Sequence, residues 1–419
     1  ALVFLVALPT LAVLLILIII NVGPLYGRMQ SAIDQVNRCI QENLTAIRVV
    51  KSYVRGDYEV EKFGVVNENL KSESEKAFGT AVLNMPAMQF VMYGTILGIL
   101  LIGGRLINEG QMMIGQLTSF LSYVLLILNS LMMMSNVFLL MTRSLASAER
   151  IMEVIDEKID ITDENAKDIA VVKGEIEFDH VWFKYKDTAK EYVLSDVSFH
   201  IKPGQTVGII GQTGSSKTTL VQLIPRLYDV TKGEVKIDGI NVKEYPVRHL
   251  RDAVAMVLQK NTLFSGSLID NLRWGNENAT LDEIKEACQI ACVDEFVDRL
   301  ADGYDTEMGQ EGVNVSGGQK QRICIARAIL KKPKVLILDD STSAVDTATE
   351  AKIRSGLAEK LPDMTKIIIA QRISSVRHAD QIIIMDRGHV EAIGTHESLL
   401  RDNQIYQEIY ASQKEGADL

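Results

Sequence analysis

The sequence predicts an all-α transmembrane region, with three spans and long cytoplasmic extensions, followed by an α/β domain with a parallel sheet. Three stretches carry no charged side chain, at residues 1–27, 77–104 and 110–142. Each is longer than the roughly 20 apolar residues that a helix needs to cross a bilayer. After Arg143 the composition is that of an ordinary globular chain, in which short β-rich runs alternate with helical patterns.

Length, charge and the start of the chain limit the classes further. A chain of 419 residues is long enough for two or three domains. Its net charge of −10 provides no basic face, so nucleic acid is not expected as a partner. Ala1 already lies inside an apolar run with no basic leader before it, so we expect a fragment whose true start lies upstream.

The membrane region is expected to cover residues 1–150, with spans at about 1–23, 78–104 and 114–142. The connection over 28–76 is rich in Lys and Arg, whereas the short connection between the second and third spans contains only Arg105. Basic connections stay on the cytoplasmic side, so the long connection and the globular domain are both predicted to be cytoplasmic. A turn is expected within the long connection, around residues 54–58.

Polar residues and methionines in the third span leave two interpretations open. Ser122, Asn129 and Asn136 are seven residues apart and therefore share a helix face, which either lines a central cavity or makes hydrogen bonds between helices. Flexible methionine side chains suit a promiscuous binding site or ordinary packing; they stand at positions 112, 113, 132, 133, 134 and 141.

The second domain is expected at residues 173–419, after a linker at 151–172. Its strands are predicted at 174–178, 206–210, 335–338, 366–369 and 381–385. Continuous apolar runs such as 335–338 are typical of buried parallel strands. Cys288 and Cys292 could share a helix face, but no second pair of ligands lies nearby, so buried thiols are favoured over a metal site.

Three motifs in this domain point to nucleotide chemistry. The first follows the strand at 206–210 and has the form of a phosphate-binding loop, whose backbone N–H groups hold phosphates at the start of a helix. Lys217 is expected to reach the β- and γ-phosphates and Thr218 to bind Mg²⁺, while Ser216 stands where the usual pattern has glycine. The other residues assigned to this loop are Gly211, Gly214, Ser215 and Thr219.

The second and third motifs follow later in the chain. Asp339 and Asp340 end the buried strand at 335–338, a position that suits Mg²⁺ coordination through water. A Ser-Gly-Gly turn at a helix start is a further anion site. Alone it is a weak signal, but its position shortly before the acidic strand makes it specific; the motif comprises Ser316, Gly317, Gly318 and Gln319.

With these motifs the sequence resembles the ATP-binding cassette family, and in particular the exporters that fuse membrane helices and cassette on one chain. The resemblance covers essentially the whole chain and implies ATP and Mg²⁺ as ligands. It implies that Tyr185 stacks on adenine and that Gln259 lies near Mg²⁺. Residues 316–319 are then the signature, residues 343–346, with Asp346, the D-loop, and Asp339 the Walker B aspartate. The spans resemble the fourth to sixth helices of an exporter half, and the region 52–63 resembles its second coupling helix.

Two departures from the family pattern carry the functional prediction. Asp340 stands in place of the catalytic glutamate, and Gln371 in place of the switch histidine. Aspartate is shorter by one methylene, or about 1.5 Å, and a misplacement of about 1 Å can slow a reaction about a hundredfold. Glutamine can hydrogen-bond a phosphate but cannot take up a proton. The site is therefore expected to bind ATP and to hydrolyse it slowly.

Cassettes of this family work as head-to-tail pairs, which suggests the nature of the partner. The intact signature would complete a competent site on a non-identical half with Glu and His at the two altered positions, as in heterodimeric bacterial multidrug exporters. We therefore expect a bacterial cell-membrane exporter of hydrophobic or amphipathic small molecules. The alternatives are a homodimer with two slow sites, exporting lipid or peptide, and an ATP-binding regulatory module that transports nothing.

Overall fold

The computed structural model describes residues 2–164, 166–340 and 344–415, and it divides the chain into two compact units, Ala1–Glu157 and Lys158–Leu419. Within the first unit, many side chains in the ranges 2–19, 84–88 and 128–146 lie outside the description. These include Asn136, Met132 and Met134, on which part of the sequence interpretation rests.

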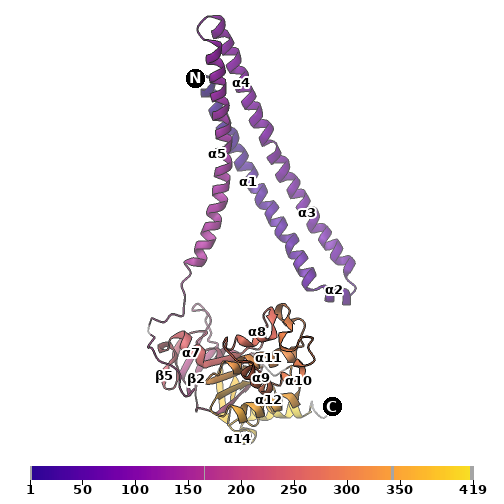
Figure 1. The fold of residues 1–419 in the computed structure, drawn as a ribbon, viewed down its shortest axis with the longest axis vertical. Helices are drawn as coiled ribbons and strands as arrows, with labels where there is room; N and C mark the ends of the chain where they lie inside the picture. Colours follow the sequence, from indigo (N-terminus) through magenta and orange to yellow (C-terminus); the bar gives the residue numbers. More distant parts are fainter. Residues whose placement is uncertain (1, 165, 341–343, 416–419) are drawn as a thin grey trace. The chain divides into compact units, whose positions relative to one another are not determined.

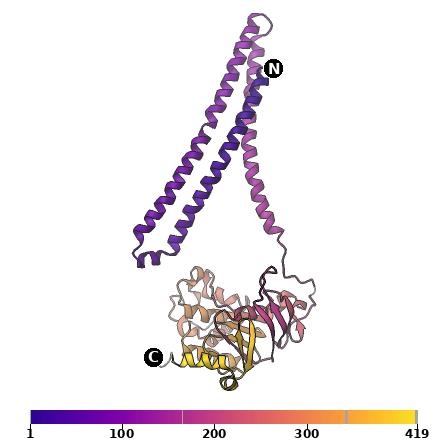
Figure 2. The ribbon, with the colours of Figure 1, turned by 180° about the vertical axis from the view of Figure 1, so that it is seen from behind.

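The first unit consists of long helices, as predicted. Helix α1 (Leu2–Thr45) runs beside α3 (Gly56–Val82), and the short α2 (Ile47–Ser52) connects them (Figures 1 and 2). The turn expected around 54–58 lies just before α3, where Val54 adopts a positive φ of 53°. Two polar contacts join α1 to α3: Asn43 Nδ2 donates to Glu59 Oε2 at 2.8 Å, and Lys62 pairs with Glu42.

The remaining helices of this unit are the apolar ones. Helix α4 (Asn84–Asn108) packs on α5 (Ile114–Ile155) through a small apolar cluster around Ile99 and Val124. Among the described residues, Gln89–Asn108 is long and apolar enough to cross a membrane, and Ile114–Ile127 is a shorter apolar helix. The number of spans and their limits therefore stay predictions. Ser122, a predicted cavity residue, donates from its hydroxyl to the carbonyl of Thr118 in its own helix.

The second unit is built on a six-stranded sheet of order β12-β11-β3-β10-β9-β6. Pairing is parallel throughout except between β11 and β12. The strands are β3 (Thr206–Gly211), β6 (Val254–Val257), β9 (Val335–Asp339), β10 (Thr365–Ile369), β11 (Gln381–Asp386) and β12 (His389–Gly394). Alternate residues of β10 face two cores, because successive side chains of a strand point to opposite faces: Ile367 and Ile369 join one cluster and Ile368 the other.

Two smaller sheets accompany the central one. An antiparallel sheet of order β2-β1-β4-β5 covers one core, and β7 pairs with β8 elsewhere in the unit. Their strands are β1 (Ile176–Phe183), β2 (Leu194–Ile201), β4 (Lys232–Ile237), β5 (Ile240–Asn241), β7 (Gly266–Ser267) and β8 (Glu307–Met308). The strand predicted at 174–178 overlaps the start of β1, which begins at Ile176.

Helices surround the sheets, and several of them contribute side chains to the core that contains Ile368. They are α6 (Lys217–Gln222), α7 (Val247–Ala253), α8 (Leu268–Arg273), α9 (Leu281–Ile290), α10 (Asp294–Val297), α11 (Gly317–Leu330), α12 (Thr347–Lys360), α13 (Ile373–Val376), α14 (His396–Asp402) and α15 (Gln404–Glu415). Short 3₁₀ turns lie at Val242–Glu244, Gly303–Asp305 and Gln310–Gly312. Cys288, Cys292 and Cys324 are free thiols buried in the core between α9 and α11.

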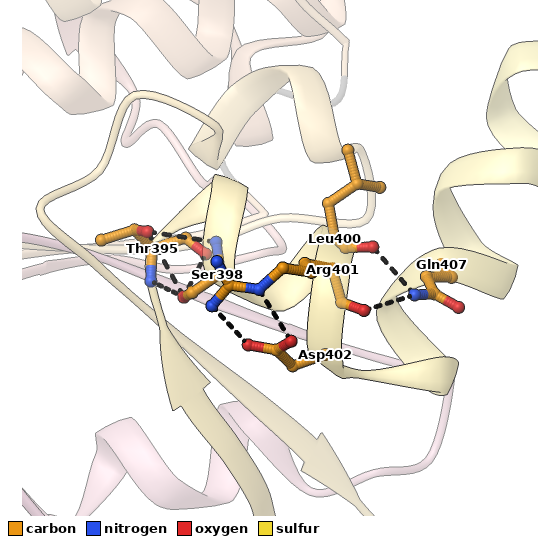
Figure 3. A network of polar contacts seen from close by, with 6 residues as sticks. All are labelled: Thr395, Ser398, Leu400, Arg401, Asp402 and Gln407. Carbon is orange, nitrogen blue, oxygen red and sulfur yellow. Dashed lines mark hydrogen bonds and ion pairs between the residues drawn. The ribbon is translucent and has the colours of Figure 1, made fainter.

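The last two helices are joined by side-chain contacts (Figure 3). Thr395 caps α14 through Ser398, and Gln407 of α15 donates to the carbonyls of Leu400 and Arg401 at 2.9 and 3.1 Å. Arg401 in turn pairs with Asp402. These bonds fix the start of α15 against α14.

The predicted linker differs from the structure at both ends. Helix α5 continues to Ile155, and the segment after it is already attached to the second unit. Asp163 accepts from the N–H of Val247 at 2.8 Å, and Asp238 accepts from the N–H of Val172 at 2.7 Å. Hydrogen bonds of this segment thus bind it to the second unit.

Candidate functional site

The candidate site lies at the carboxyl ends of β3, β9 and β10, which are adjacent in the central sheet. Loops that follow neighbouring parallel strands meet at one edge, where open α/β sheets bind ligands. The residues expected to act on phosphate therefore meet there from distant parts of the chain. They line a cavity of about 220 Å³, formed by Thr213, Gly214, Ser216, Lys217, Thr218, Gln259, Asp339, Asp340, Ile369 and Gln371.

The phosphate loop is held in a turn that only certain residues allow. Gly214 has a φ of +86°, and Ser216 adopts the left-handed region with a φ of 70°. A side chain at Gly211 would bring a Cβ within 2.2 Å of the Met385 carbonyl oxygen. The missing glycine at position 216 is thus replaced by a residue in a conformation that glycine adopts more readily.

Lys217 is folded back onto its own loop. Its Nζ donates to the carbonyls of Gly211 and Gln212 at 2.7 and 2.9 Å and to Ser215 Oγ at 3.2 Å. Burial lowers the pKa of Lys217, and the nearby Asp340 and Asp339 oppose this effect. The ammonium group is therefore partly desolvated and bonded to neutral oxygens, which a phosphate can replace as a stronger, charge-assisted acceptor.

Asp339 is the most buried carboxylate of the site, with 1% of its surface exposed. Thr218 Oγ1 donates to its Oδ1 at 3.1 Å, while Oδ2 is buried and has no hydrogen-bond partner among the described residues. Burial raises the pKa of Asp339. A buried oxygen without a partner is costly, and a carboxylate beside a threonine hydroxyl is a donor set that suits a hard cation such as Mg²⁺.

Asp340 is held by two glutamine side chains. Gln371 Nε2 donates to Asp340 Oδ2 at 2.8 Å, and Gln259 Nε2 lies 3.5 Å from the same oxygen. Burial raises the pKa of Asp340, and the two amide bonds counteract that rise. The structure thus brings the three candidate catalytic residues of the sequence analysis, Asp340, Gln371 and Gln259, into direct contact.

Tyr185 lies beside the loop at half exposure and not in the cavity itself. Its hydroxyl forms a hydrogen bond with Thr219 Oγ1 at 2.8 Å, and its ring packs edge-to-face on Tyr228 with centroids 5.1 Å apart. Tyr228 was not singled out from the sequence, because a lone tyrosine after α6 carries no motif. Thr213 and Ile369 of the cavity wall were also missed, although Thr213 stands within the loop motif.

The signature is placed apart from the cavity. Ser316 caps α11 by accepting from the N–H of Gln319, and a Cβ on Gly318 would lie 2.7 Å from the Ala344 carbonyl oxygen. Gly317 is exposed at the start of the helix, and Gly318 is half-buried. Of the D-loop, Ser343 lies outside the described residues.

Asp346 has a local role that the sequence analysis did not anticipate. Its carboxylate accepts from the N–H of Thr349 at 2.9 Å and so caps α12. The hydrogen bonds from Thr349 lower the pKa of Asp346. The spacing of an aspartate three residues before Thr349 at a helix start is the signal for this cap.

Comparisons with known proteins agree with this arrangement. The family model described as the ABC transporter transmembrane region matches residues 1–131, and that described as the ABC transporter matches residues 194–343. The ABC transporter ATP-binding protein YfiB of Bacillus subtilis (strain 168) is 41% identical over 416 residues, which cover 99% of this chain and 72% of the relative. From the same organism, the putative multidrug export ATP-binding/permease protein YgaD is 35% identical over 407 residues, covering 94% and 69%.

A solved structure shows the same likeness. The structure of a bacterial Atm1-family ABC exporter with ATP bound superposes with a TM-score of 0.87 at 28% sequence identity, covering 98% of this chain and 72% of that one. The likeness extends over both the helical unit and the α/β unit.

Proposed function

This chain belongs to the ABC transporter family as a half-transporter that joins a transmembrane region to an ATP-binding cassette, and from that premise we propose the division of labour within its dimer. It is a membrane-integral ATPase coupled to transport. We propose that it binds ATP at a slow site of its own and supplies residues 316–319 to the faster site of a non-identical partner. The proposal has two parts, slow turnover at this chain's own site and a contribution to the partner's site, and the two parts rest on different residues.

The observation that carries the proposal is the pairing of Asp340 with Gln371. The carboxylate that would activate water is one methylene shorter than glutamate, and it already accepts from Gln371 at 2.8 Å. A general base contributes about 10²–10⁴-fold to a rate when it reaches the proton it removes. Because Gln371 cannot accept a proton, it can orient the terminal phosphate without taking part in proton transfer.

The proposed Mg²⁺ site fits the residues present. Asp339, whose Oδ2 has no partner among the described residues, and Thr218, whose hydroxyl bonds Oδ1, would hold the ion with Gln259 nearby. When bound, Mg²⁺ neutralises charge that develops between the β- and γ-phosphates. Lys217 meanwhile exchanges its carbonyl partners for phosphate oxygens.

The partner and the substrate follow from different evidence. Ser316 and Gly317 are exposed at the start of α11, where a nucleotide bound by a second cassette could reach them, which supports a role at the partner's site. For the transported molecule, the relative YgaD is named as a putative multidrug export protein. We propose hydrophobic or amphipathic small molecules as the substrate class and a bacterial cell membrane as the location.

The proposal is tested by separating ATP binding from hydrolysis in the purified chain. We expect Mg²⁺-dependent ATP binding, with phosphate release about a hundredfold slower than that of an assembly with a partner that carries Glu and His. Lys217→Ala should abolish binding. Rapid phosphate release from a crosslinked assembly that contains only this chain would show a homodimer with competent sites and refute the proposal.

A second prediction concerns Tyr185 as the adenine platform. Tyr185→Ala is expected to weaken ATP binding about tenfold, since stacking of a base on an aromatic ring contributes about 1–3 kcal/mol. Tyr185→Phe removes only the hydroxyl bond to Thr219 and should stay within about twofold of the native affinity, because a single neutral hydrogen bond contributes little. The measurement is the dissociation constant of ATP for each variant; equal losses in both would assign the role to the hydroxyl.

A further inference from the structure

The C-terminal helix α15 makes a contact with the turn at residues 371–373, called the switch turn below, that nucleotide binding by itself does not require. Gln413, in the last turn of α15, accepts at its Oε1 from the N–H of Ile373 at 2.8 Å. The Nε2 of the same amide donates to the carbonyl of Gln371 at 2.7 Å. One side chain thus bridges the backbone on both sides of Arg372, directly after the residue that contacts Asp340.

This bridge satisfies backbone groups that the turn leaves open. Ile373 is the first residue of α13, and Arg372 at its N-cap makes no side-chain capping bond. The first N–H groups of a helix lack partners within it, and Gln413 supplies one from another helix. Only one orientation of the amide meets both an N–H and a C=O, so a glutamate here would place an oxygen against the Gln371 carbonyl.

The position of Gln413 is set by the core. In α15 Tyr406 is fully buried, and Ile405, Ile409 and Tyr410 pack against the cluster that also contains Ile373. Tyr406 OH is hydrogen-bonded to His396 Nδ1 at 2.7 Å, which ties α15 to α14. The helix is therefore fixed along its length, and its last turn carries Gln413 to the switch turn.

A continuous series of hydrogen bonds leads from α15 to the site. It runs from Gln413 to the backbone of Gln371, and from the Gln371 side chain to Asp340 Oδ2 at 2.8 Å. A free glutamine side chain loses rotamer entropy when it is ordered. Because Gln413 already holds the backbone of Gln371, less conformational entropy remains to be lost when the Gln371 amide binds a phosphate.

We propose that Gln413 is a positioning residue for the switch turn, through which the C-terminal helix sets how well Gln371 meets the terminal phosphate of ATP. The inference rests on the phosphate contact assigned to Gln371 under the proposed function. It does not depend on slow turnover or on a non-identical partner. ADP lacks the terminal phosphate, so Gln413 affects ATP affinity and leaves ADP affinity unchanged.

The test compares dissociation constants of ATP and ADP, with Mg²⁺, for the purified full-length chain. Gln413→Ala is expected to weaken ATP about fivefold, the scale of one well-placed hydrogen bond, with ADP within about twofold. The matched control is Gln407→Ala, which removes two bonds to backbone carbonyls from the same helix but at α14 (Figure 3). It should change neither affinity, and melting temperatures of both variants report any loosening of α15.

A double-mutant cycle with Gln371→Ala completes the test, because coupled residues give non-additive effects. If Gln413 acts through Gln371, then Gln413→Ala has no further effect on ATP affinity once Gln371 is alanine. Parallel losses of ATP and ADP affinity, persistence of the effect in the Gln371→Ala background, or unchanged ATP affinity in Gln371→Ala alone would each overturn the inference. If the separate proposal of a slow site is wrong, the phosphate-release rate shows it, and these binding measurements do not.

Discussion

Replacing Asp340 by glutamate and Gln371 by histidine together is expected to raise ATP hydrolysis by the purified chain about a hundredfold. The longer carboxylate regains the reach that Asp340 lacks, and the imidazole supplies a group that can both contact phosphate and exchange a proton. The amide of Gln371, which donates to Asp340 Oδ2 in the native chain, is removed in the same step. Phosphate release with Mg²⁺ measures the change.

The controls separate restored chemistry from altered binding. Each single substitution should give a smaller gain, because the two side chains act on one another and their effects do not add. Adding Lys217→Ala must abolish the gain, since Lys217 is part of the phosphate loop that the chemistry needs. An unchanged rate in the double variant with ATP affinity intact would show that something other than these two residues limits turnover.

Much of the cassette follows from local patterns in the sequence. The apolar runs at 206–210, 335–338 and 366–369 are β3, β9 and β10, because continuous burial leaves few alternatives to a parallel strand. Placing the motifs at strand ends then predicts that they meet at one edge. The order of the strands was not predictable in this way: β10 lies between β3 and β9 although it follows both in the chain.

The contacts that the sequence did not reveal are those between distant side chains. Gln413 and Tyr228 reach the site only because α15 and the loop after α6 pack where they do, and neither belongs to a local motif. A polar residue type is compatible with several partners, and packing at long range decides among them.

Asp339→Asn is expected to remove the Mg²⁺ dependence of ATP binding and to make the cassette more stable. In the native chain, removing Mg²⁺ should weaken ATP binding, because the ion neutralises charge on the phosphates. In the variant, the neutral amide is a poor ligand, so the same removal should change little. Asn keeps an oxygen for the Thr218 hydroxyl, which bonds Asp339 Oδ1 at 3.1 Å. Titration of ATP with and without a chelator measures this half of the prediction.

The stability half follows from the burial of Asp339. Burial raises the pKa of its carboxyl, so without Mg²⁺ the charged form costs stability above the unfolded pKa, and this cost is relieved as pH falls through the folded pKa. Removing the charge should raise stability by about 1–2 kcal/mol, or the melting temperature by about 2–4 °C per kcal/mol. The advantage over the native chain should shrink on acidification.

Asp346→Asn is the matched control for this second effect. Hydrogen bonds from Thr349 lower the pKa of Asp346, so its charged form is favoured in the folded chain, and the same substitution should not raise the melting temperature. The contrast assigns the gain at position 339 to burial rather than to a general effect of removing a negative charge from a chain of net charge −10. If the melting temperatures of both variants rise by the same amount, overall charge repulsion explains the result. Burial of the charged Asp339 carboxylate would then not be the cause of the stability cost.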